Sequence, residues 1–296
     1  MDSKIKITIA IIIGLFVLSW IVAAFFDRGQ FGNVAHIRIN GVIMEEKGGF
    51  FDAGTAPSSE VVKFIKKANE EAGIKAILLD INSPGGAAVA SAEIAEAVKK
   101  SNKTVVALIR DSGTSGAYWA ASPAYKIVAH PLSITGSIGV YGSYLQFSGL
   151  LEKYNVSYER LVSGEYKDIG SPFKQLTDDE RKSLQNTLDL MHEYFIQSVA
   201  ENRNMSIEDV RKIANGNFYI GMEAKKLGLV DFLGSQDVAE EIIKKRENLT
   251  EVNLVEYKTK TSLFEALGSV MNGFGFSFGK GFANGVIEKS AGDIKV

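Results

Sequence analysis

Hydrophobic and polar stretches alternate along the chain in a way that predicts strands and helices in turn. The run 75–81 is almost continuously apolar, which is typical of a strand buried on both faces of a sheet. Because strands alternate with helices, we expect an α/β fold with a mostly parallel sheet and right-handed crossovers. The predicted strands are 34–40, 75–81, 104–109, 125–129 and 134–141, and the predicted helices in this half are 58–72 and an alanine-rich segment ending at Lys100.

The pattern changes to a helical one after Thr177. Three acidic residues, 178–180, suit the positive end of a helix dipole. An apolar stripe at helical spacing follows and predicts a face packed in the core. The stripe consists of Leu184, Leu188, Met191, Phe195 and Val199, and shorter helices are predicted at 206–214 and 237–245.

Residues 7–26 contain no charged side chain and follow Lys4 and Lys6. Twenty residues at about 1.5 Å each span about 30 Å, the thickness of a bilayer core. A cleaved signal peptide is the alternative, since Val22-Ala23-Ala24 resembles a cleavage site, but the length favours a retained anchor. The positive-inside rule then predicts a single-pass protein of the cell membrane, with a cytoplasmic N-terminus and an extracytoplasmic body.

Composition narrows the possible chemistry. The chain of 296 residues has a formal net charge of −2, which does not suggest nucleic-acid binding, and it has no cysteine. No histidine and carboxylate spacing indicates a metal site, and no cofactor is expected.

Glycines and phenylalanines alternate near the C-terminus. We therefore expect a stub and anchor at 1–27, a catalytic domain at 28–248 and a Phe/Gly-rich tail at 249–296.

Ser115 is the strongest candidate nucleophile. It lies among small residues in Asp111-Ser-Gly-Thr-Ser-Gly-Ala-Tyr-Trp119, directly before a helical run. Lys167 lies in a loop bounded by glycines and Pro172, where a lysine could point inward. If the two side chains meet, they form a Ser-Lys hydrolase site; if not, the serine is an ordinary one. A lysine acts as a base only when burial lowers its pKa from about 10.4, and Asp168 would oppose this if it faced the same way.

A serine hydrolase also needs donors for the developing oxyanion. Asn82-Ser-Pro-Gly-Gly86 follows a buried strand, at the edge where open α/β sheets bind ligands. We expect the N–H groups of Gly86 and Gly116 to form the oxyanion hole, although Pro-Gly-Gly alone is more typical of a plain turn. The Ser137 hydroxyl is the candidate for orienting the lysine.

His130 is the rival base. It would form a Ser-His-Asp site with an acid such as Asp80 or Asp111. A polar residue before Pro131 is, however, more often a turn former.

Four motifs in order carry a resemblance to a known family. The chain resembles the short, one-repeat, membrane-anchored form of signal peptide peptidase A over about 34–245. The resemblance implies a crotonase- and Clp-protease-like fold, with Ser115 as nucleophile and Lys167 as general base. It also implies cleavage of hydrophobic peptides such as remnant signal peptides, and a ring-like homo-oligomer with sites completed near subunit interfaces. The motifs are Asn82-Ser-Pro-Gly-Gly86, Ser115-Gly-Ala-Tyr118, Thr135-Gly-Ser-Ile-Gly-Val140 and Tyr166-Lys-Asp-Ile-Gly-Ser-Pro172.

Two other hypotheses remain besides a Ser-Lys peptidase. One is an enzyme of the same fold with different chemistry, such as a Clp-like Ser-His-Asp peptidase. The other is a non-catalytic membrane scaffold, whose sign would be an unreactive Ser115 in a folded protein. The resemblance favours the Ser-Lys peptidase, while the sequence leaves the preference of its pocket open.

Overall fold

The computed structural model describes residues 13–14, 16–18, 32–46 and 54–258. The described residues of 32–46 and 54–257 belong to one compact unit. Most of the expected anchor at 7–26, and the tail after residue 258, lie outside the described residues. In the parts of the chain that are described, no helix has the length and hydropathy needed to cross a bilayer.

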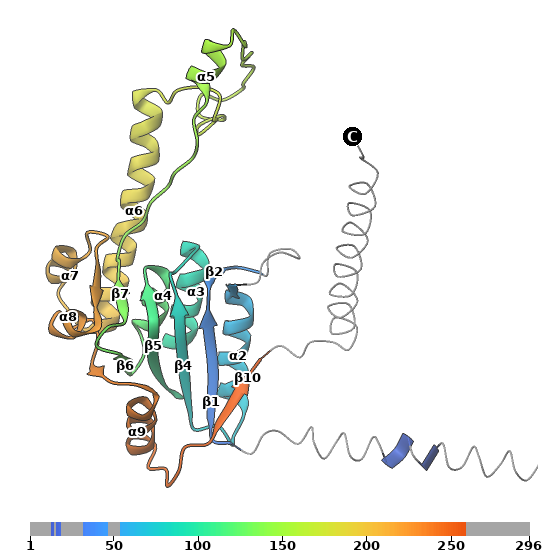
Figure 1. The fold of residues 1–296 in the computed structure, drawn as a ribbon, viewed down its shortest axis with the longest axis vertical. Helices are drawn as coiled ribbons and strands as arrows, with labels where there is room; N and C mark the ends of the chain where they lie inside the picture. The colour runs from blue at the N-terminus through green and yellow to red at the C-terminus, as the bar shows by residue number, and fades with distance from the viewer. Residues whose placement is uncertain (1–12, 15, 19–31, 47–53, 259–296) are drawn as a thin grey trace, which may run out of the picture. The chain divides into compact units, whose positions relative to one another are not determined.

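A mostly parallel sheet forms the centre of the unit, as the alternation of strands and helices predicted (Figure 1). Its six main strands are in the order β10-β1-β4-β5-β6-β9, and every neighbouring pair is parallel. β7 pairs in parallel with the end of β5, and β8 pairs antiparallel with β7. The strands of this sheet are β1 (Val34–Asn40), β4 (Ala76–Ser83), β5 (Thr104–Thr114), β6 (Lys126–Ala129), β7 (Ile134–Gly136), β8 (Phe218–Ile220), β9 (Phe232–Leu233) and β10 (Leu254–Tyr257).

Helices cover the two faces of the sheet unequally. One face carries the larger core, in which side chains of β1, β4 and β5 pack against α2, α3, α4 and the end of α6. The other face has a smaller core under α9. A separate two-stranded sheet pairs β2 (Val42–Met44) with β3 (Thr55–Pro57). The helices are α2 (Ser58–Glu70), α3 (Ala88–Lys99), α4 (Gly116–Ala121), α5 (Ser148–Lys153), α6 (Asp178–Arg203), α7 (Ile207–Ile213), α8 (Gly221–Lys226) and α9 (Gln236–Arg246).

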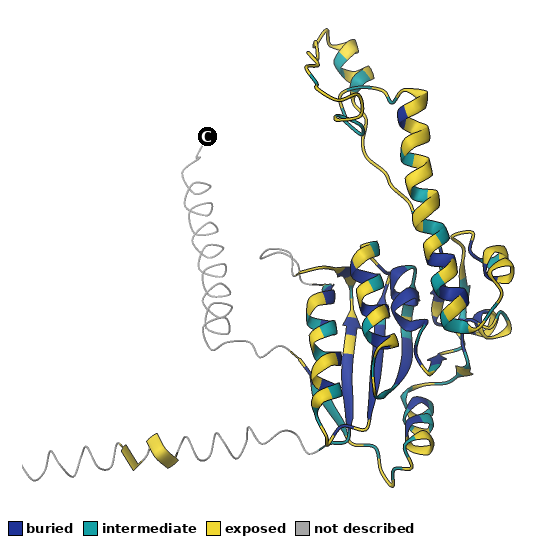
Figure 2. Cartoon of the chain, turned by 180° about the vertical axis from the view of Figure 1, so that it is seen from behind, coloured by how far each residue is buried: buried dark blue, intermediate teal, exposed yellow. Residues whose placement is uncertain are grey.

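The long helix α6 begins with a capping box. The Glu180 N–H donates to the Thr177 hydroxyl, and the Glu180 carboxylate accepts from the Thr177 N–H. Only the carboxyl-terminal part of the predicted apolar stripe reaches the core: Phe195 and Val199 are buried, whereas Met191 is 37% exposed. Figure 2 shows the amino-terminal part of α6 as mainly exposed. The prediction that the whole stripe is core was therefore wrong, because the helix extends past the sheet that it packs on.

Three other segments differ from the sequence predictions. β5 continues to Thr114 and so leads directly into Ser115. The expected strand at 134–141 is regular only to Gly136. Residues 254–257, which we placed in the tail, form β10 and pair with β1 at the edge of the sheet. β10 was not predicted because its strand conformation depends on pairing with β1. The paired residues lie more than 200 positions apart in the sequence, so no local pattern reveals the pairing.

Candidate active site

Ser115 lies between the carboxyl end of β5 and the first residue of α4, and its backbone is unusual. Its φ of 53° and ψ of −126° are rare for a residue with a side chain. The Ser115 N–H donates to the Gly136 carbonyl of β7 at 2.8 Å, and the Ser115 carbonyl accepts from the Trp119 N–H at 3.0 Å. These bonds hold the strained turn. A non-glycine residue kept in such a conformation is often functional, because the strain is retained where it positions a side chain.

The turn after β4 packs directly against the turn after β5. β4 and β5 are parallel neighbours, so both turns lie at the same edge of the sheet. A Cβ atom added to Gly85 (φ 98°) would lie 2.7 Å from the Gly116 nitrogen and 2.9 Å from the Ser115 Cβ. Only glycine allows this approach, which is the physical reason for Pro84-Gly85-Gly86 at this point.

Two backbone N–H groups beside Ser115 are unused. Within the described residues, neither the Gly86 N–H nor the Gly116 N–H donates a hydrogen bond. They lie close together, since a Cβ added to Gly116 would be 3.3 Å from the Gly86 nitrogen. The Gly116 N–H also lies at the start of α4, where helical N–H groups have no internal acceptor. Two unused backbone N–H donors beside a serine are the groups that form an oxyanion hole.

Ser115, Gly86 and Gly116 line one cavity of about 260 Å³, which we call the Ser115 cavity. Its walls come from the start of α3, from α4, from the chain after β7 and from α6. No side chain among them is charged. The other lining residues are Ala87, Ala88, Trp119, Gly139, Val140, Tyr141, Leu188, Met191 and Phe195.

Lys167 is not among the residues that line this cavity. It is exposed, in a segment that we call the arm, residues 141–177. The Lys167 N–H donates to the Gly164 carbonyl at 3.1 Å, within a turn of the arm. In Figure 1 the part of the arm around α5 lies near the amino-terminal end of α6, away from α4. Within one chain the structure thus brings together Ser115 and the two glycines but does not bring Lys167 to them.

Asp168, next to Lys167, is bound to other cations. Arg160 donates to both of its carboxylate oxygens, at 2.6 and 2.9 Å, and the Lys174 ammonium lies 3.4 Å away. These partners, Arg160 first, hold the pKa of Asp168 well below its usual range. Lys174 also donates to Glu180, which ties the arm to the start of α6. Asp168 therefore does not pair with Lys167, which has no carboxylate partner among the described residues.

Ser137, the candidate orienting hydroxyl, lies just after β7. Its backbone also has a positive φ, 52°. Its N–H donates to the Asn217 carbonyl at 2.8 Å, and its hydroxyl donates to the Gly216 carbonyl at 3.2 Å. Ser137 is not among the residues lining the Ser115 cavity. Its hydroxyl is engaged by the neighbouring loop in this chain.

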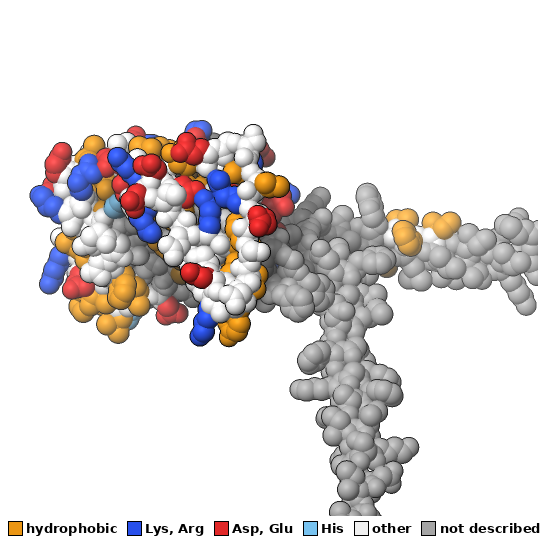
Figure 3. All heavy atoms as spheres, turned by 90° about the horizontal axis from the view of Figure 1, so that it is seen from above, with side chains coloured by type: hydrophobic (Ala, Val, Ile, Leu, Met, Phe, Trp, Pro, Cys, Tyr) orange, Lys and Arg blue, Asp and Glu red, His pale blue; other side chains and the backbone are white. Residues whose placement is uncertain are grey.

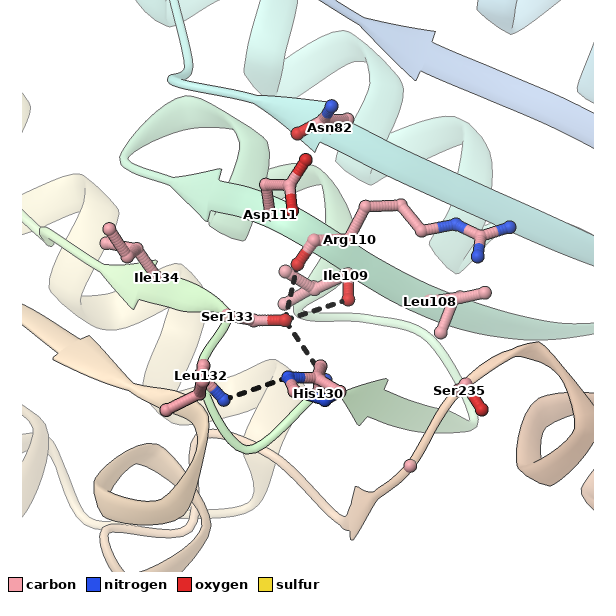
Figure 4. A pocket seen from close by; sticks show the side chains of 11 residues that line it. Asn82, Leu108, Ile109, Arg110, Asp111, His130, Leu132, Ser133, Ile134 and Ser235 are labelled. Atoms are coloured by element: carbon pink, nitrogen blue, oxygen red, sulfur yellow. Dashed lines mark hydrogen bonds between the residues drawn. The ribbon is translucent and has the colours of Figure 1, made fainter.

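His130 lines a different cavity, of about 710 Å³ (Figure 4). Its ring Nδ1 accepts from the Leu132 backbone N–H at 3.2 Å, and the His130 backbone N–H donates to the Ser133 hydroxyl at 3.0 Å. It closes a turn, as residues before proline often do. The Ser133 hydroxyl in turn donates to the carbonyls of Ile109 and Arg110. The structure does not bring His130 to the Ser115 cavity.

Asp80, a candidate acid for His130, is instead bound to His36. The His36 Nε2 lies 2.9 Å from the Asp80 carboxylate, and Arg110 donates to both carboxylate oxygens, at 2.7 and 2.8 Å. Burial alone would raise the pKa of Asp80, but the hydrogen bonds from Arg110 and His36 lower it to about 2. Asp111, the other candidate acid, is exposed and lines the His130 cavity. Neither acid forms a hydrogen bond with His130 among the described residues.

The contribution of α6 to the site was not predicted from the sequence. Leu188, Met191 and Phe195 line the Ser115 cavity, but their helical spacing only showed that they share one face. The cavity wall formed by Trp119 was missed as well. Among the described residues no group of three or more histidine, aspartate or glutamate side chains is arranged to hold a metal ion.

Comparison with known proteins shows similarity to proteases. Residues 97–251 match the family described as peptidase family S49. A Methanocaldococcus jannaschii protein provisionally named a protease is 34% identical over 235 residues, which cover 79% of this chain and 75% of the relative. An Enterococcus faecium protein provisionally named a signal peptide peptidase is also 34% identical, over 78% of this chain and 68% of the relative.

A longer relative is similar to this chain over only part of its own length. Protease 4 of Salmonella typhi is 33% identical over 246 residues, covering 82% of this chain but 39% of the relative. The region that matches the family contains Ser115, Gly116 and Lys167 and ends shortly before β10. The chain belongs to peptidase family S49, the family of signal peptide peptidase A-type proteases.

Proposed function

We propose that this protein is a membrane-anchored serine endopeptidase that cleaves hydrophobic peptides, such as remnant signal peptides, by a Ser-Lys dyad. One observation carries the proposal. Ser115 is held in a strained turn beside two unused N–H groups, in a cavity without charged side chains. A reactive serine, donors for an oxyanion and an apolar recess are the elements of acyl transfer from a hydrophobic peptide.

In the proposed reaction, the Ser115 hydroxyl oxygen attacks the carbonyl carbon while the neutral Lys167 amine takes its proton. The carbonyl oxygen becomes an oxyanion that accepts from the Gly86 and Gly116 N–H groups. The C–N bond then breaks, and the leaving amine takes the proton from the Lys167 ammonium. Water, deprotonated by the same amine, hydrolyses the acyl-enzyme and restores the serine. Ser137 is proposed to orient the amine.

Lys167 would come from the arm of a neighbouring copy in a ring-like homo-oligomer. The arm carries large exposed apolar side chains, which are unfavourable in water and suit burial against a second chain. Tyr141 is 88% exposed, Leu145 74% and Leu161 98%. Figure 3 shows hydrophobic side chains interspersed with charges of both signs on the face that it presents. That distribution suits a protein partner better than a polyanion.

We further propose the crotonase- and Clp-protease-like fold for the body and a single-pass anchor at residues 7–26, with the body outside the cytoplasm. The lining of the Ser115 cavity gives no support to a Ser-His-Asp site within one chain, because His130 lies in a different cavity. A non-catalytic scaffold would not need two unused donors beside a strained serine.

The test uses the full chain in detergent micelles and a fluorogenic hydrophobic peptide, from about pH 6 to 10. Lys167→Ala should abolish cleavage, whereas His130→Ala should retain it. Lys153→Ala is the matched control, because it removes another exposed lysine of the arm. Activity of the wild type should rise with pH as an amine loses its proton. Loss of cleavage in the His130 variant alone would replace the dyad with a triad.

Mixing inactive variants tests assembly of the site between copies. Ser115→Ala supplies an intact Lys167 and Lys167→Ala an intact Ser115, so mixed oligomers contain some complete sites. Activity should return on mixing if the dyad forms between chains. Each variant alone, and the double variant mixed with either, serve as controls. No recovery in oligomers shown to exchange subunits would place both residues in one chain.

A further inference from the structure

Basic side chains gather at the edge of the sheet where its parallel strands begin, which we call the amino edge (Figure 1). Lysines directly precede β4 and β5 and begin β6, and α9 returns to this edge with three basic residues in its last turn. Cations at a helix end favour the helix dipole, but that does not explain lysines at the starts of strands. The cations of the amino edge are Lys75, Lys103, Lys126, Lys244, Lys245 and Arg246.

Part of this positive charge is not neutralised within the chain. Among the described residues, Lys75, Lys103 and Lys244 form no ion pair, and the Lys75 ammonium donates only to the Ala72 carbonyl, at 3.1 Å. Most acids at the same edge are bound by other groups, so they do not cancel these three charges. Glu71 pairs with Lys67, Glu96 with Lys100 and Asp231 with Lys126, and Glu247 accepts from the Thr104 hydroxyl.

An exposed tyrosine lies among these cations. Tyr125 directly precedes β6 and is 44% exposed. The guanidinium carbon of Arg246 lies 4.8 Å from the centre of its ring, and the Lys126 ammonium lies 5.4 Å from it. Tyrosine rings are enriched at the headgroup level of membranes, and lysines and arginines close to a membrane attract its anionic lipids. The amino edge thus combines both kinds of side chain that a charged lipid surface binds.

The chain also enters the folded body at this edge. The Lys75 N–H donates to the Asn33 carbonyl at 2.7 Å, so the chain that leads into β1 lies beside the start of β4. In the sequence, Gly32 follows Phe26, the end of the proposed anchor, by six residues. Six residues span at most about 20 Å even when fully extended. An anchor at 7–26 would therefore hold the start of β1, and with it the amino edge, within about that distance of the membrane.

We infer that the amino edge binds the headgroups of anionic phospholipids, with Lys75, Lys103 and Lys244 at the phosphates and Tyr125 at the headgroup level. The inference rests on the proposed anchor and adds the orientation of the body: the strands start at the membrane and point away from it. A short tether alone would permit many orientations. The unpaired lysines favour one of them, because electrostatic attraction acts only within about 10 Å at 0.1 M salt.

The experiment uses single cysteines as attachment points for a fluorophore, since the chain has no cysteine of its own. Asn102→Cys places the label at the amino edge and Leu132→Cys places it at the opposite edge; both residues are exposed. The full chain is inserted in nanodiscs of phosphatidylcholine, with or without phosphatidylglycerol, that contain a lipid with a nitroxide on its headgroup. With phosphatidylglycerol, quenching should be several-fold stronger at position 102 than at position 132.

Charge variants identify the lysines responsible. Replacing the three unpaired lysines with glutamine should lower quenching at position 102 to its value in phosphatidylcholine alone, as high salt should. A matched control removes three exposed lysines of α6 and α8 and should leave the quenching unchanged. The test variant is Lys75→Gln/Lys103→Gln/Lys244→Gln, and the control is Lys182→Gln/Lys225→Gln/Lys226→Gln.

The outcomes separate this inference from the proposed anchor. An inserted chain with equal quenching at positions 102 and 132, or with equal effects of the two triple variants, would overturn the inference alone. A chain that does not insert would overturn the anchor. Flotation of that chain with phosphatidylglycerol vesicles, lost in the test variant but not in the control, would still support the basic edge. Absence of flotation would overturn the inference as well.

Discussion

Arg160 binds the carboxylate of Asp168 through two hydrogen bonds, of 2.6 and 2.9 Å. The acid that follows Lys167 in sequence is therefore already paired with another cation of the arm. If Arg160 is removed, Lys174 at 3.4 Å remains as the nearest cation.

We accordingly expect Arg160→Ala to lower the rate near neutral pH and to move the pH dependence of kcat/KM to higher pH. The freed carboxylate of Asp168 would favour the ammonium form of a nearby lysine. The double variant Arg160→Ala/Asp168→Asn should return the profile toward that of the wild type, because the carboxylate is gone. An identical upward shift in both variants would contradict this explanation.

The strain at Ser115 should be visible in stability. A residue with a side chain at φ 53° and ψ −126° costs about 1–3 kcal/mol, while glycine adopts this conformation freely. Glycine loses about 0.5–1 kcal/mol more chain entropy on folding than alanine. We therefore expect Ser115→Gly to be more stable than Ser115→Ala by about 1 kcal/mol in thermal unfolding.

Ser183, exposed in α6, gives the matched control. There the same pair of substitutions should have the opposite sign, with glycine about 1 kcal/mol less stable than alanine, as is usual in a helix. Equal stability of the two Ser115 variants would show that the turn is not strained.

Close packing of the two turns should make the oxyanion donors sensitive to Gly85. A methyl group there would lie 2.7 Å from the Gly116 nitrogen, so the backbone must move. Displacing one donor costs about 100-fold or more in kcat. Gly85→Ala should therefore lower kcat by at least that factor at temperatures where circular dichroism shows a folded chain.

Gly73→Ala serves as its control. Gly73 lies between α2 and β4, and a Cβ there would meet no atom within 4 Å. It should retain wild-type kcat. Activity of Gly85→Ala within a few-fold of wild type would mean that these N–H groups do not stabilise the transition state.

The buried carboxylate of Asp80 should contribute to stability in a pH-dependent way. Hydrogen bonds from Arg110 and His36 outweigh burial and lower its pKa from 3.8 to about 2. Since the pKa is lower in the folded chain, the contribution is fully present above about pH 4 and is lost as the pH falls toward 2. A difference of this size corresponds to about 2 kcal/mol.

Urea unfolding of wild type and Asp80→Asn at several pH values measures this contribution. The variant should be less stable by at least about 2 kcal/mol at pH 7, and the difference should shrink by that amount near pH 2. Glu96→Gln, which removes one partner of an exposed pair with Lys100, should show no measurable change at pH 7. A difference independent of pH would mean that Asp80 acts through packing rather than charge.

The sequence by itself determined the elements that carry a local signal. The apolar run of β4, the alanine-rich α3 and the acidic start of α6 all have the predicted type, with boundaries within a few residues. The edge strand β10 and the short β8 were missed, because short strands are defined by their partners rather than by their own residues.

The site also has parts that local sequence signals predict and parts that they do not. Ser115, Gly86 and Gly116 lie in turns that directly follow parallel neighbouring strands, so chain order alone brings them to one edge of the sheet. The sequence could not place the arm that carries Lys167, since no periodic pattern relates it to the sheet.

Only the tertiary structure decided which side chains form the cavity. Met191 and Phe195 share one face of α6, yet the first lines an open wall and the second is buried against Trp119. Helical periodicity fixes which residues lie together on a helix. How far that helix extends past the sheet depends on packing between distant segments, and this decides whether its apolar face is core or binding surface.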